Sequence, residues 1–273
     1  MAKFKLGLIV SLQHDPREEL EKIHTLGFPT CQVACWNADL YSDDIAWKLR
    51  KAAEESDVEV TTIWAGLPGK YVWNLVDGPR TIGLVPLETR KMRLQALKKA
   101  SNFAREAGVE SITTHVGFIP EDPRDTVYVT LVNALRDVAR FCRDSGQSFW
   151  FETGQETPVT LLRTIEDTAA GNLGINFDPA NLLMYGKANP VDALDTIGRY
   201  VRGVHAKDGE YPTNGGELGK ERPLGQGHVN FPLLVSKLKA LGYTGALTIE
   251  REISGPQQME DIKKAKTFLE ELC

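Results

Sequence analysis

Short apolar runs of strand length alternate with longer segments of helical period along the chain, and this alternation can be counted to eight. The strand-length runs lie at residues 4–10, 30–36, 58–65, 111–116, 147–152, 173–178, 201–207 and 245–250. The helical segments lie near residues 15–26, 43–56, 87–107, 124–145, 158–168, 190–198, 231–241 and 256–271. Eight consecutive βα units form a closed barrel more readily than an open sheet. The sequence therefore predicts an α/β fold, a (β/α)8 TIM barrel.

Two connections between these segments are longer than an ordinary βα loop. They span residues 66–86 and 208–230, and both follow a strand, so both are expected to cover the mouth of the barrel. The first is equally consistent with a tolerated surface insertion and with a lid or subunit contact. The second is glycine-rich and carries Arg222 and His228, which favours a loop that folds over a ligand. No linker or change in composition divides the chain, so residues 1–273 are predicted to form one domain.

The composition favours a protein that binds a small molecule. The formal net charge is -5 and no run of Lys and Arg is dense, which opposes binding to a phosphate backbone. No stretch of about 18 apolar residues could span a membrane, and the first apolar run is too short for a signal peptide. The cysteines are scattered apart from Cys31 and Cys35, which are interpreted as reduced core residues. We expect a cytoplasmic protein without nucleic-acid or membrane partners.

Four side chains that can bind a metal stand at the ends of four consecutive predicted strands. They are Glu152, Asp178, His205 and Glu250. The carboxyl ends of parallel barrel strands converge on one mouth, so residues far apart in sequence can share a site there. Side chains alternate between the barrel interior and the helices, and the residues preceding these four are all apolar, as packing against helices requires. The four side chains are therefore predicted to point into the mouth together.

The same alternation places two further side chains in the mouth. Trp64 stands at the end of the third predicted strand and His115 at the end of the fourth. Trp64 would give the mouth an aromatic wall. His115 would either hydrogen-bond a substrate or satisfy a buried polar position.

The joint pattern of carboxylates predicts a cation. Taken singly, each carboxylate is typical of a loop or a helix cap. Clustered in a mouth of low dielectric constant, the carboxylates would repel one another unless a cation or a network of salt bridges neutralises them. Three carboxylates and one imidazole favour one divalent metal ion, with Mn²⁺ expected first and Mg²⁺, Co²⁺ or Zn²⁺ as alternatives.

Five motifs, in order over nearly the whole chain, resemble those of the xylose-isomerase-like TIM-barrel sugar phosphate isomerase/epimerase family. They are FETGQET at 151–157, NFDPAN at 176–181, VHAKD at 204–208, PLGQG at 223–227 and IE at 249–250. In relatives of the ketose 3-epimerase type, the strand-end Glu, Asp, His and Glu bind one divalent metal, and the two Glu also act as acid and base. The resemblance implies that Glu152, Asp178, His205 and Glu250 bind the metal, with Glu152 and Glu250 as the catalytic pair.

The resemblance also implies contacts to the substrate. An Arg shortly after the histidine strand binds substrate in such relatives, and Arg222 is the matching residue. Asn181 departs from the pattern, because those epimerases often have His at this position. The residues expected to contact substrate are Trp64, His115, Asn181, Lys207 and Arg222. Lys207 would otherwise pair with Asp208 and shape the loop.

The implied reaction is epimerisation or isomerisation of a keto sugar or sugar derivative. A cation chelated by a carbonyl oxygen and the neighbouring hydroxyl lowers the cost of removing the proton between them. If Glu152 or Glu250 takes that proton and the other returns one to the opposite face, the product is an epimer. Return to the adjacent carbon interconverts an aldose and a ketose, and both outcomes pass through a metal-bound cis-enediolate. We rank epimerisation first.

Other functions remain open at this point. A keto-sugar (glycoside) lyase begins with the same proton abstraction, and a non-catalytic sugar-binding barrel needs no turnover. A glycosidase with Glu152 and Glu250 would leave Asp178 and His205 without a purpose. A DNA-repair endonuclease of the same superfamily would need several zinc ions, and the few well-placed histidines argue against it. The expected partner is a small-molecule sugar, and relatives often form a homodimer or homotetramer.

Overall fold

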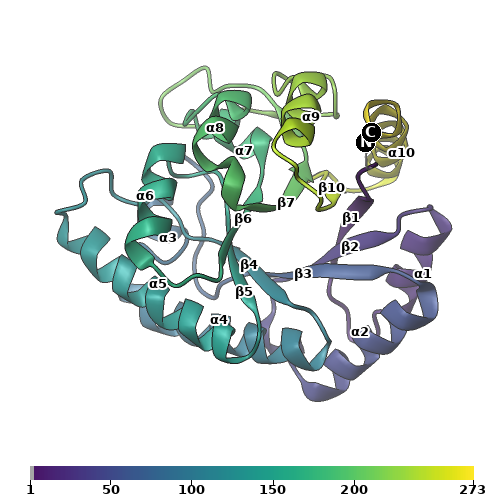
Figure 1. Ribbon diagram of the computed structural model, residues 1–273, viewed down its shortest axis with the longest axis horizontal. Coiled ribbons are helices and arrows are strands. Elements are labelled where there is room, and N and C mark those ends of the chain that lie inside the picture. The colour runs from purple at the N-terminus through teal and green to yellow at the C-terminus, as the bar shows by residue number, and fades with distance from the viewer. Residues whose placement is uncertain (1–2) are drawn as a thin grey trace.

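The computed structural model describes residues 3–273 and shows a closed barrel of parallel strands surrounded by helices (Figure 1). Around the barrel the strands follow the order β1-β10-β7-β6-β5-β4-β3-β2. They are β1 (Leu6–Ser11), β2 (Thr30–Cys35), β3 (Glu59–Ala65), β4 (Ser111–His115), β5 (Ser148–Glu152), β6 (Leu173–Phe177), β7 (Val201–Ala206) and β10 (Leu247–Ile249). Each barrel strand coincides with one of the predicted runs, so the predicted TIM barrel is confirmed.

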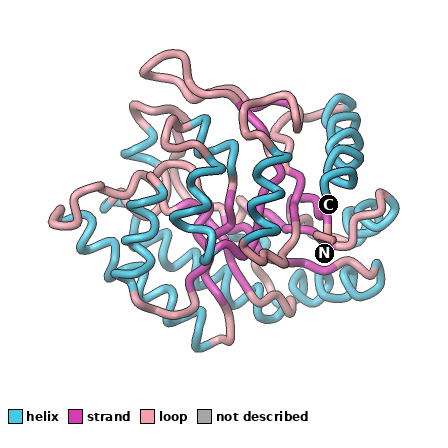
Figure 2. The backbone as a smooth tube through the Cα atoms, turned by 45° about the horizontal axis from the view of Figure 1, so that its top comes forward, coloured by secondary structure: helices cyan, strands magenta, loops and turns pink. Residues whose placement is uncertain are grey.

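Helices lie outside the ring of strands (Figure 2). Those that match the predicted helical segments are α1 (Arg17–Thr25), α2 (Asp43–Ser56), α4 (Leu87–Glu106), α5 (Thr126–Asp144), α6 (Pro158–Thr168), α8 (Pro190–Ile197), α9 (Phe231–Ala240) and α10 (Pro256–Leu272). The elements that were not predicted are short: η1 (Ala38–Leu40), α3 (Gly78–Thr81), α7 (Pro179–Met184), η2 (Gly198–Tyr200), β8 (Asp208–Gly209) and β9 (Glu221–Arg222). Among residues 3–273, no helix is both long and apolar enough to cross a membrane.

The core between strands and helices follows from the alternation of side chains along each strand. Phe151, Phe177 and Val204 are completely buried, and Ile249 is almost so. Each of them directly precedes one of the four predicted metal-binding residues. Because these apolar side chains are buried against the helices, the next side chain along each strand is directed to the opposite side, into the barrel.

A buried arginine of α4, Arg93, holds the loop of residues 66–86. The Arg93 side chain is completely buried and donates hydrogen bonds to three carbonyl oxygens of this loop. They belong to Pro68 at 3.0 Å, Lys70 at 3.2 Å and Gly83 at 2.7 Å. Gly83 has a φ of 75°, and a Cβ there would overlap the backbone of Val116. The loop is therefore packed closely against α4 and the end of β4.

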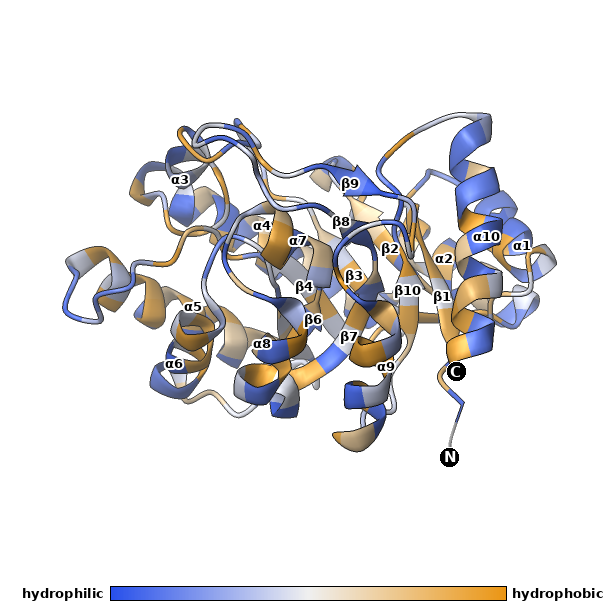
Figure 3. Ribbon diagram, turned by 90° about the horizontal axis from the view of Figure 1, so that it is seen from above, coloured by the Kyte–Doolittle hydropathy of each residue, from blue (hydrophilic) through white to orange (hydrophobic). Residues whose placement is uncertain are grey.

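The second long loop, residues 208–230, is organised around the carboxylate of Asp208. Its oxygens accept hydrogen bonds from the backbone N–H groups of Gly225, Gly227 and Val229 at 3.0, 3.0 and 3.1 Å. A Cβ at Gly227 would overlap this carboxylate. The strands β8 and β9 form an antiparallel pair within the loop, visible above the barrel in Figure 3. The two long loops also meet, because the Leu75 N–H donates to the Gly216 carbonyl at 3.0 Å.

Candidate metal centre

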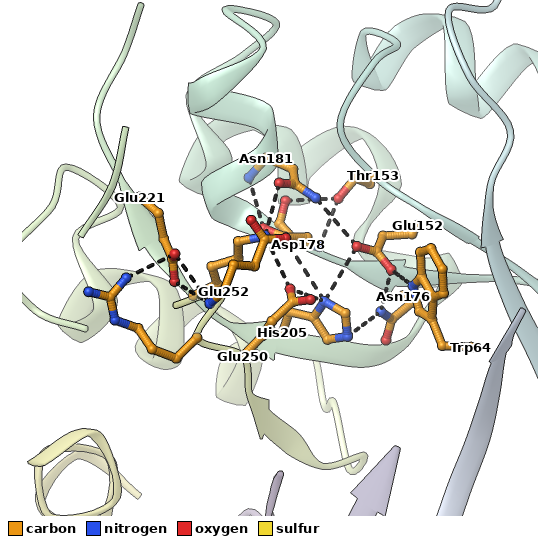
Figure 4. A network of polar contacts seen from close by, with 12 residues as sticks. Trp64, Glu152, Thr153, Asn176, Asp178, Asn181, His205, Glu221, Glu250 and Glu252 are labelled. Carbon is orange, nitrogen blue, oxygen red and sulfur yellow. Dashed lines mark hydrogen bonds and ion pairs between the residues drawn. The ribbon is translucent and has the colours of Figure 1, made fainter. Parts of the chain in front are cut away.

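Four strands bring the predicted metal-binding side chains together at one end of the barrel (Figure 4). Glu152 ends β5, Asp178 follows β6, His205 lies near the end of β7 and Glu250 follows β10. Each of the four offers one ligand atom, and these atoms all lie within 4.8 Å of one another. The common mouth of parallel strands thus gathers residues that are spread over about a hundred positions of sequence.

Neighbouring side chains fix the orientation of Asp178. Its Oδ1 accepts a hydrogen bond from the Asn181 N–H at 2.8 Å and so caps the N-terminus of α7. The Thr153 hydroxyl accepts from the Asp178 N–H at 2.8 Å and donates to the Asp178 carbonyl at 2.9 Å. With the backbone held and Oδ1 engaged, Oδ2 is directed to the centre of the cluster.

The imidazole of His205 lies against two amides of the barrel interior, and the Gln32 carbonyl is the one that can accept from it. His205 Nε2 lies 2.9 Å from Gln32 Oε1 and 2.9 Å from Asn176 Nδ2. Gln32 Nε2 in turn donates to Asn176 Oδ1 at 2.9 Å. As a metal ligand, a neutral His205 with its hydrogen on Nε2 would donate to Gln32 and keep a lone pair on Nδ1. Nδ1 faces the carboxylates, at 3.0 Å from Glu250 Oε2 and 3.5 Å from Glu152 Oε1.

The arrangement of these atoms fits a divalent cation. Asp178 Oδ2, His205 Nδ1 and Glu250 Oε2 are buried and make no hydrogen bond within the described residues, although Lys207 and His205 form ion pairs with the two carboxylates. Buried polar atoms normally have hydrogen-bond partners, because leaving them without one is costly. Carboxylate oxygens with one imidazole nitrogen form a ligand set suited to Mn²⁺, Mg²⁺ or Co²⁺. The cluster could therefore hold one metal ion.

The electrostatics of the cluster are dominated by burial and by its two basic side chains. Burial raises the pKa of Glu250, but Lys207 and His205 oppose this and bring that pKa below its usual range. Burial also raises the pKa of Asp178, and Lys207 offsets only part of that shift. Burial lowers the pKa of His205, yet the carboxylates of Glu152 and Glu250 raise it well above its usual value. The site thus favours positive charge at its centre.

Lys207 supplies one such charge from beside the cluster. Its Nζ lies 3.2 Å from Glu250 Oε2, 3.5 Å from Asp178 Oδ2 and 2.7 Å from Glu252 Oε1. The side chain is buried, and these carboxylates raise its pKa well above the usual value although burial acts to lower it. Lys207 does not pair with Asp208, whose carboxylate is engaged by backbone N–H groups of its own loop.

Three of the predicted substrate contacts surround Glu152. Trp64 Nε1 donates to Glu152 Oε2, and Asn181 Nδ2 donates to Glu152 Oε1 at 3.3 Å. His115 Nε2 lies 3.6 Å from Glu152 Oε1. Despite burial, which raises it, the pKa of Glu152 is lowered by His205 and His115. Trp64, His115 and Asn181 also line a cavity of about 740 Å³ whose floor includes Glu152 and Glu250.

Two of the predicted contacts do not line this cavity: Lys207, which lies beside the cluster, and Arg222. Arg222 lies on β9 with an exposed side chain, and its Nε is 2.8 Å from Glu210 Oε1. The residues lining the large cavity do not include it. Its guanidinium pairs with a carboxylate of its own loop, and Arg222 lines a small pocket together with Lys207 and Glu250, so its contact to a substrate stays a prediction.

Sequence reasoning did not single out three residues that shape the site. Gln32 orients His205, Glu252 binds Lys207, and Trp36 lines the cavity. Gln32 and Trp36 share one parity along and just beyond β2. A glutamine at an inward position in the middle of a mostly apolar strand was the available signal for Gln32.

Comparisons with known proteins agree with the fold. The chain matches the family model described as xylose isomerase-like TIM barrel over residues 20–272. A solved xylose isomerase domain protein from Planctomyces limnophilus is 36% identical, covers 99% of this chain and 98% of that chain, and superimposes with a TM-score of 0.93. A solved D-tagatose 3-epimerase-like protein is 24% identical, with coverage of 98% and 96% and a TM-score of 0.75. An uncharacterised protein of Methanocaldococcus jannaschii is 26% identical over 98% of this chain and 88% of its own length.

Proposed function

The chain belongs to the xylose isomerase-like TIM barrel family, and we propose that it is a divalent-metal-dependent epimerase or isomerase of a keto sugar or sugar derivative. The observation that carries this proposal is the placement of two glutamates around one imidazole. His205 Nδ1 lies 3.5 Å from Glu152 Oε1 and 3.0 Å from Glu250 Oε2. The two glutamates come from β5 and β10, which are separated in the barrel by β6 and β7.

The proposed ligands of the metal are Glu152, Asp178, His205 and Glu250, and the proposed ion is Mn²⁺. When bound, such an ion acidifies the carbon between a carbonyl and a neighbouring hydroxyl, because it withdraws electron density from their oxygens. Neighbouring side chains already orient two of the proposed ligand atoms. Asp178 Oδ2 and His205 Nδ1 are already directed inward by the cap of α7 and by Gln32.

The two glutamates are the proposed proton-transfer pair. Both have a pKa below the usual range, so both are ionised at neutral pH and one can accept a proton from the substrate. Trp64 and Asn181 hold the Glu152 carboxylate by hydrogen bonds, and Lys207 holds that of Glu250. Removal of a proton by one glutamate and return by the other on the opposite face inverts the carbon. Return to the adjacent carbon would instead move the carbonyl.

A metal-loading experiment tests the site without knowledge of the substrate. The parent protein, Asp178→Ala and Glu250→Ala are stripped of metal, reloaded with Mn²⁺ and measured by elemental analysis. We expect about one ion per chain in the parent and a large loss in both variants. Glu210→Ala serves as the control, because Glu210 is a carboxylate of the mouth loop that pairs with Arg222 outside the cluster. Equal metal in all four proteins would contradict the proposed ligand set.

Hydrogen exchange into a sugar tests the reaction. A panel of ketoses and keto-glycosides is incubated with Mn²⁺-loaded protein in deuterated water and examined by NMR. We expect deuterium at the carbon beside the carbonyl, and its loss in Glu152→Gln and Glu250→Gln. Release of the group on the next carbon would identify a lyase instead. Metal uptake without deuterium exchange into any sugar would favour a non-catalytic sugar-binding barrel.

A further inference from the structure

An aromatic wall rises from the metal cluster along one side of the cavity. We define it as Trp36, Trp64, Tyr71 and Trp73. Ring centroids are 4.9 Å apart for Trp36 and Trp64, 5.4 Å for Trp36 and Tyr71, and 5.4 Å for the stacked pair Tyr71 and Trp73. Trp64 joins the wall to the cluster, since its Nε1 donates to Glu152. The wall therefore continues directly from the proposed reaction centre toward the opening.

The wall is held in place from behind. Gly66 lies against Trp36, and a Cβ there would come within 2.7 Å of the indole ring, so the glycine permits this close approach. The guanidinium of Arg93 lies 4.9 Å from the centroid of Tyr71 while it binds three carbonyls of the same loop. Trp36 is thus supported by the backbone at Gly66, and Trp73 is supported through Tyr71, on which it stacks.

Two members of the wall remain open to the cavity in spite of this support. Trp36 is 52% exposed and Trp73 is 42% exposed, and both line the cavity. Large exposed aromatic surfaces next to a polar site are typical of ligand-binding grooves. Trp36 adjoins Trp64, and Trp73 adjoins His115 at 5.7 Å, and these two neighbours lie between the outer indoles and Glu152. Trp36 and Trp73 would therefore contact a part of a ligand that lies away from its reacting carbon.

The charges around the cavity oppose a phosphate group. Within residues 3–273, the Lys and Arg side chains that line the cavity are Lys22 and Arg251. Lys22 lies 3.9 Å from Glu19, and Arg251 pairs with Glu221 at 2.9 Å and Asp261 at 2.8 Å. Several carboxylates line the cavity as well: Glu19, Glu152, Glu250 and Glu252. Outside the proposed metal ligands, a dianionic phosphate would meet Glu19 and Glu252, while Arg251 is already engaged by two carboxylates and Lys22 lies next to Glu19.

We propose that Trp36 and Trp73 form a subsite for the second ring of a neutral glycoside, so that the substrate is a glycoside rather than a free or phosphorylated monosaccharide. This inference rests on the proposed function, which places the reacting sugar at the cluster. A cavity of about 740 Å³ lies within the range of about 300–1,000 Å³ that is usual for pockets that bind drug-sized ligands. The apolar face of a sugar ring or an aryl ring would stack on the indoles.

Binding measurements with matched probes test the subsite. For each of glucose, galactose and xylose, calorimetry compares the free sugar, its p-nitrophenyl glycoside and its β-1,4-linked disaccharide, with glucose 6-phosphate as the anionic probe. We expect at least one glycoside to bind about tenfold more tightly than its free sugar, and the phosphate not to bind more tightly than glucose. Tighter binding of the disaccharides identifies a sugar as the second ring, and tighter binding of the p-nitrophenyl compounds identifies an aryl group.

Tryptophan variants test whether Trp36 and Trp73 cause the tighter binding of the glycoside. Trp36→Ala and Trp73→Ala should each remove most of the preference for the glycoside. Trp47→Ala is the matched control, because Trp47 on α2 is 59% exposed and does not line the cavity. The inference is overturned if no glycoside binds better than its free sugar, if the preference survives both variants, or if glucose 6-phosphate binds best. It is also overturned if both variants change only the sedimentation of the protein, since the wall would then be a contact between copies of the chain.

The two proposals fail separately. Binding is measured both with and without Mn²⁺, and therefore does not depend on turnover. If glycosides bind more tightly but no sugar exchanges deuterium, the proposed reaction is contradicted and the proposed subsite is supported. If deuterium exchange occurs but free sugars and glycosides bind with equal affinity, the proposed reaction is supported and the proposed subsite is contradicted.

Discussion

The Glu156→Gln variant should become increasingly stable relative to the parent protein as the pH rises. Glu156 lies in the loop between β5 and α6, and only 3% of its surface is exposed. Both carboxyl oxygens are buried without a hydrogen-bond partner in the described part of the chain. Burial raises the pKa of Glu156 to about 8, although nearby Lys187 acts to lower it. The folded protein therefore keeps a proton here that the unfolded chain loses.

The size of the effect follows from proton linkage. An unfolded glutamate loses its proton near pH 4.5, whereas the folded protein retains it up to about pH 8. Between these values the folded state binds one proton more, so its stability falls by about 1.4 kcal/mol for each unit by which the pH rises. The amide of the substituted glutamine would not ionise. The free energy of unfolding of Glu156→Gln minus that of the parent should therefore grow by about 3 kcal/mol between pH 5 and pH 7.

Urea denaturation in the presence of a chelator measures this difference without a contribution from metal binding. Parent and Glu156→Gln are compared at several values of pH between 5 and 7, and Glu271→Gln, at an exposed position of α10, serves as the control. A constant offset between the proteins would reflect packing or hydrogen bonding alone. If the Glu156→Gln difference does not change with pH, or shrinks as the pH rises, the buried carboxyl does not hold a proton and the reasoning is refuted.

Three further predictions concern the supports of the mouth. Arg93→Met should lower the free energy of unfolding by about 3 kcal/mol and speed amide exchange in residues 66–86, because three loop carbonyls lose their donor. Unchanged amide exchange would contradict this role of Arg93. Asp208→Ala should speed exchange of the Gly225, Gly227 and Val229 amides, measured by mass spectrometry, and protection equal to the parent would refute its role as their anchor. Gln32→Met should weaken Mn²⁺ binding by about tenfold in calorimetry, because His205 loses the acceptor of its Nε2–H. Equal Mn²⁺ affinity in the variant and the parent would show that Gln32 does not set the tautomer of His205.

Residues on strands could be predicted because a strand fixes both the depth and the direction of its side chains. Glu152 and His205 each follow an apolar residue that packs against the helices, and the strand ends converge on the common mouth of the barrel. Asn181 follows Asp178 by a single helical turn, so its position is determined once Asp178 caps α7. Trp64 was identified in the same way, by its place at the end of β3.

Loops and exceptional helix positions could not be predicted in this way. The direction of Arg222 depends on the path of a long loop, which has no periodicity, and its partner Glu210 lies on the same loop. Arg93 belongs to a helix rich in charged residues, where an arginine is normally exposed, and its burial depends on carbonyls of a distant loop. Gln32 acquires its role only from His205 on the other side of the barrel. In each case the missing information was a contact between segments far apart in sequence.

The closure of the barrel has a consequence for how a nascent chain acquires its metal site. β1 pairs with β10 through Leu6 with Leu247 and Leu8 with Ile249. Until β10 has left the ribosome, β1 and β7 are open edges whose unpaired backbone groups can join strands of other chains. Glu250 directly follows β10, so the segment that covers these edges also delivers the last of the four candidate ligands. An incomplete chain can therefore neither bury its edges nor assemble the full ligand set.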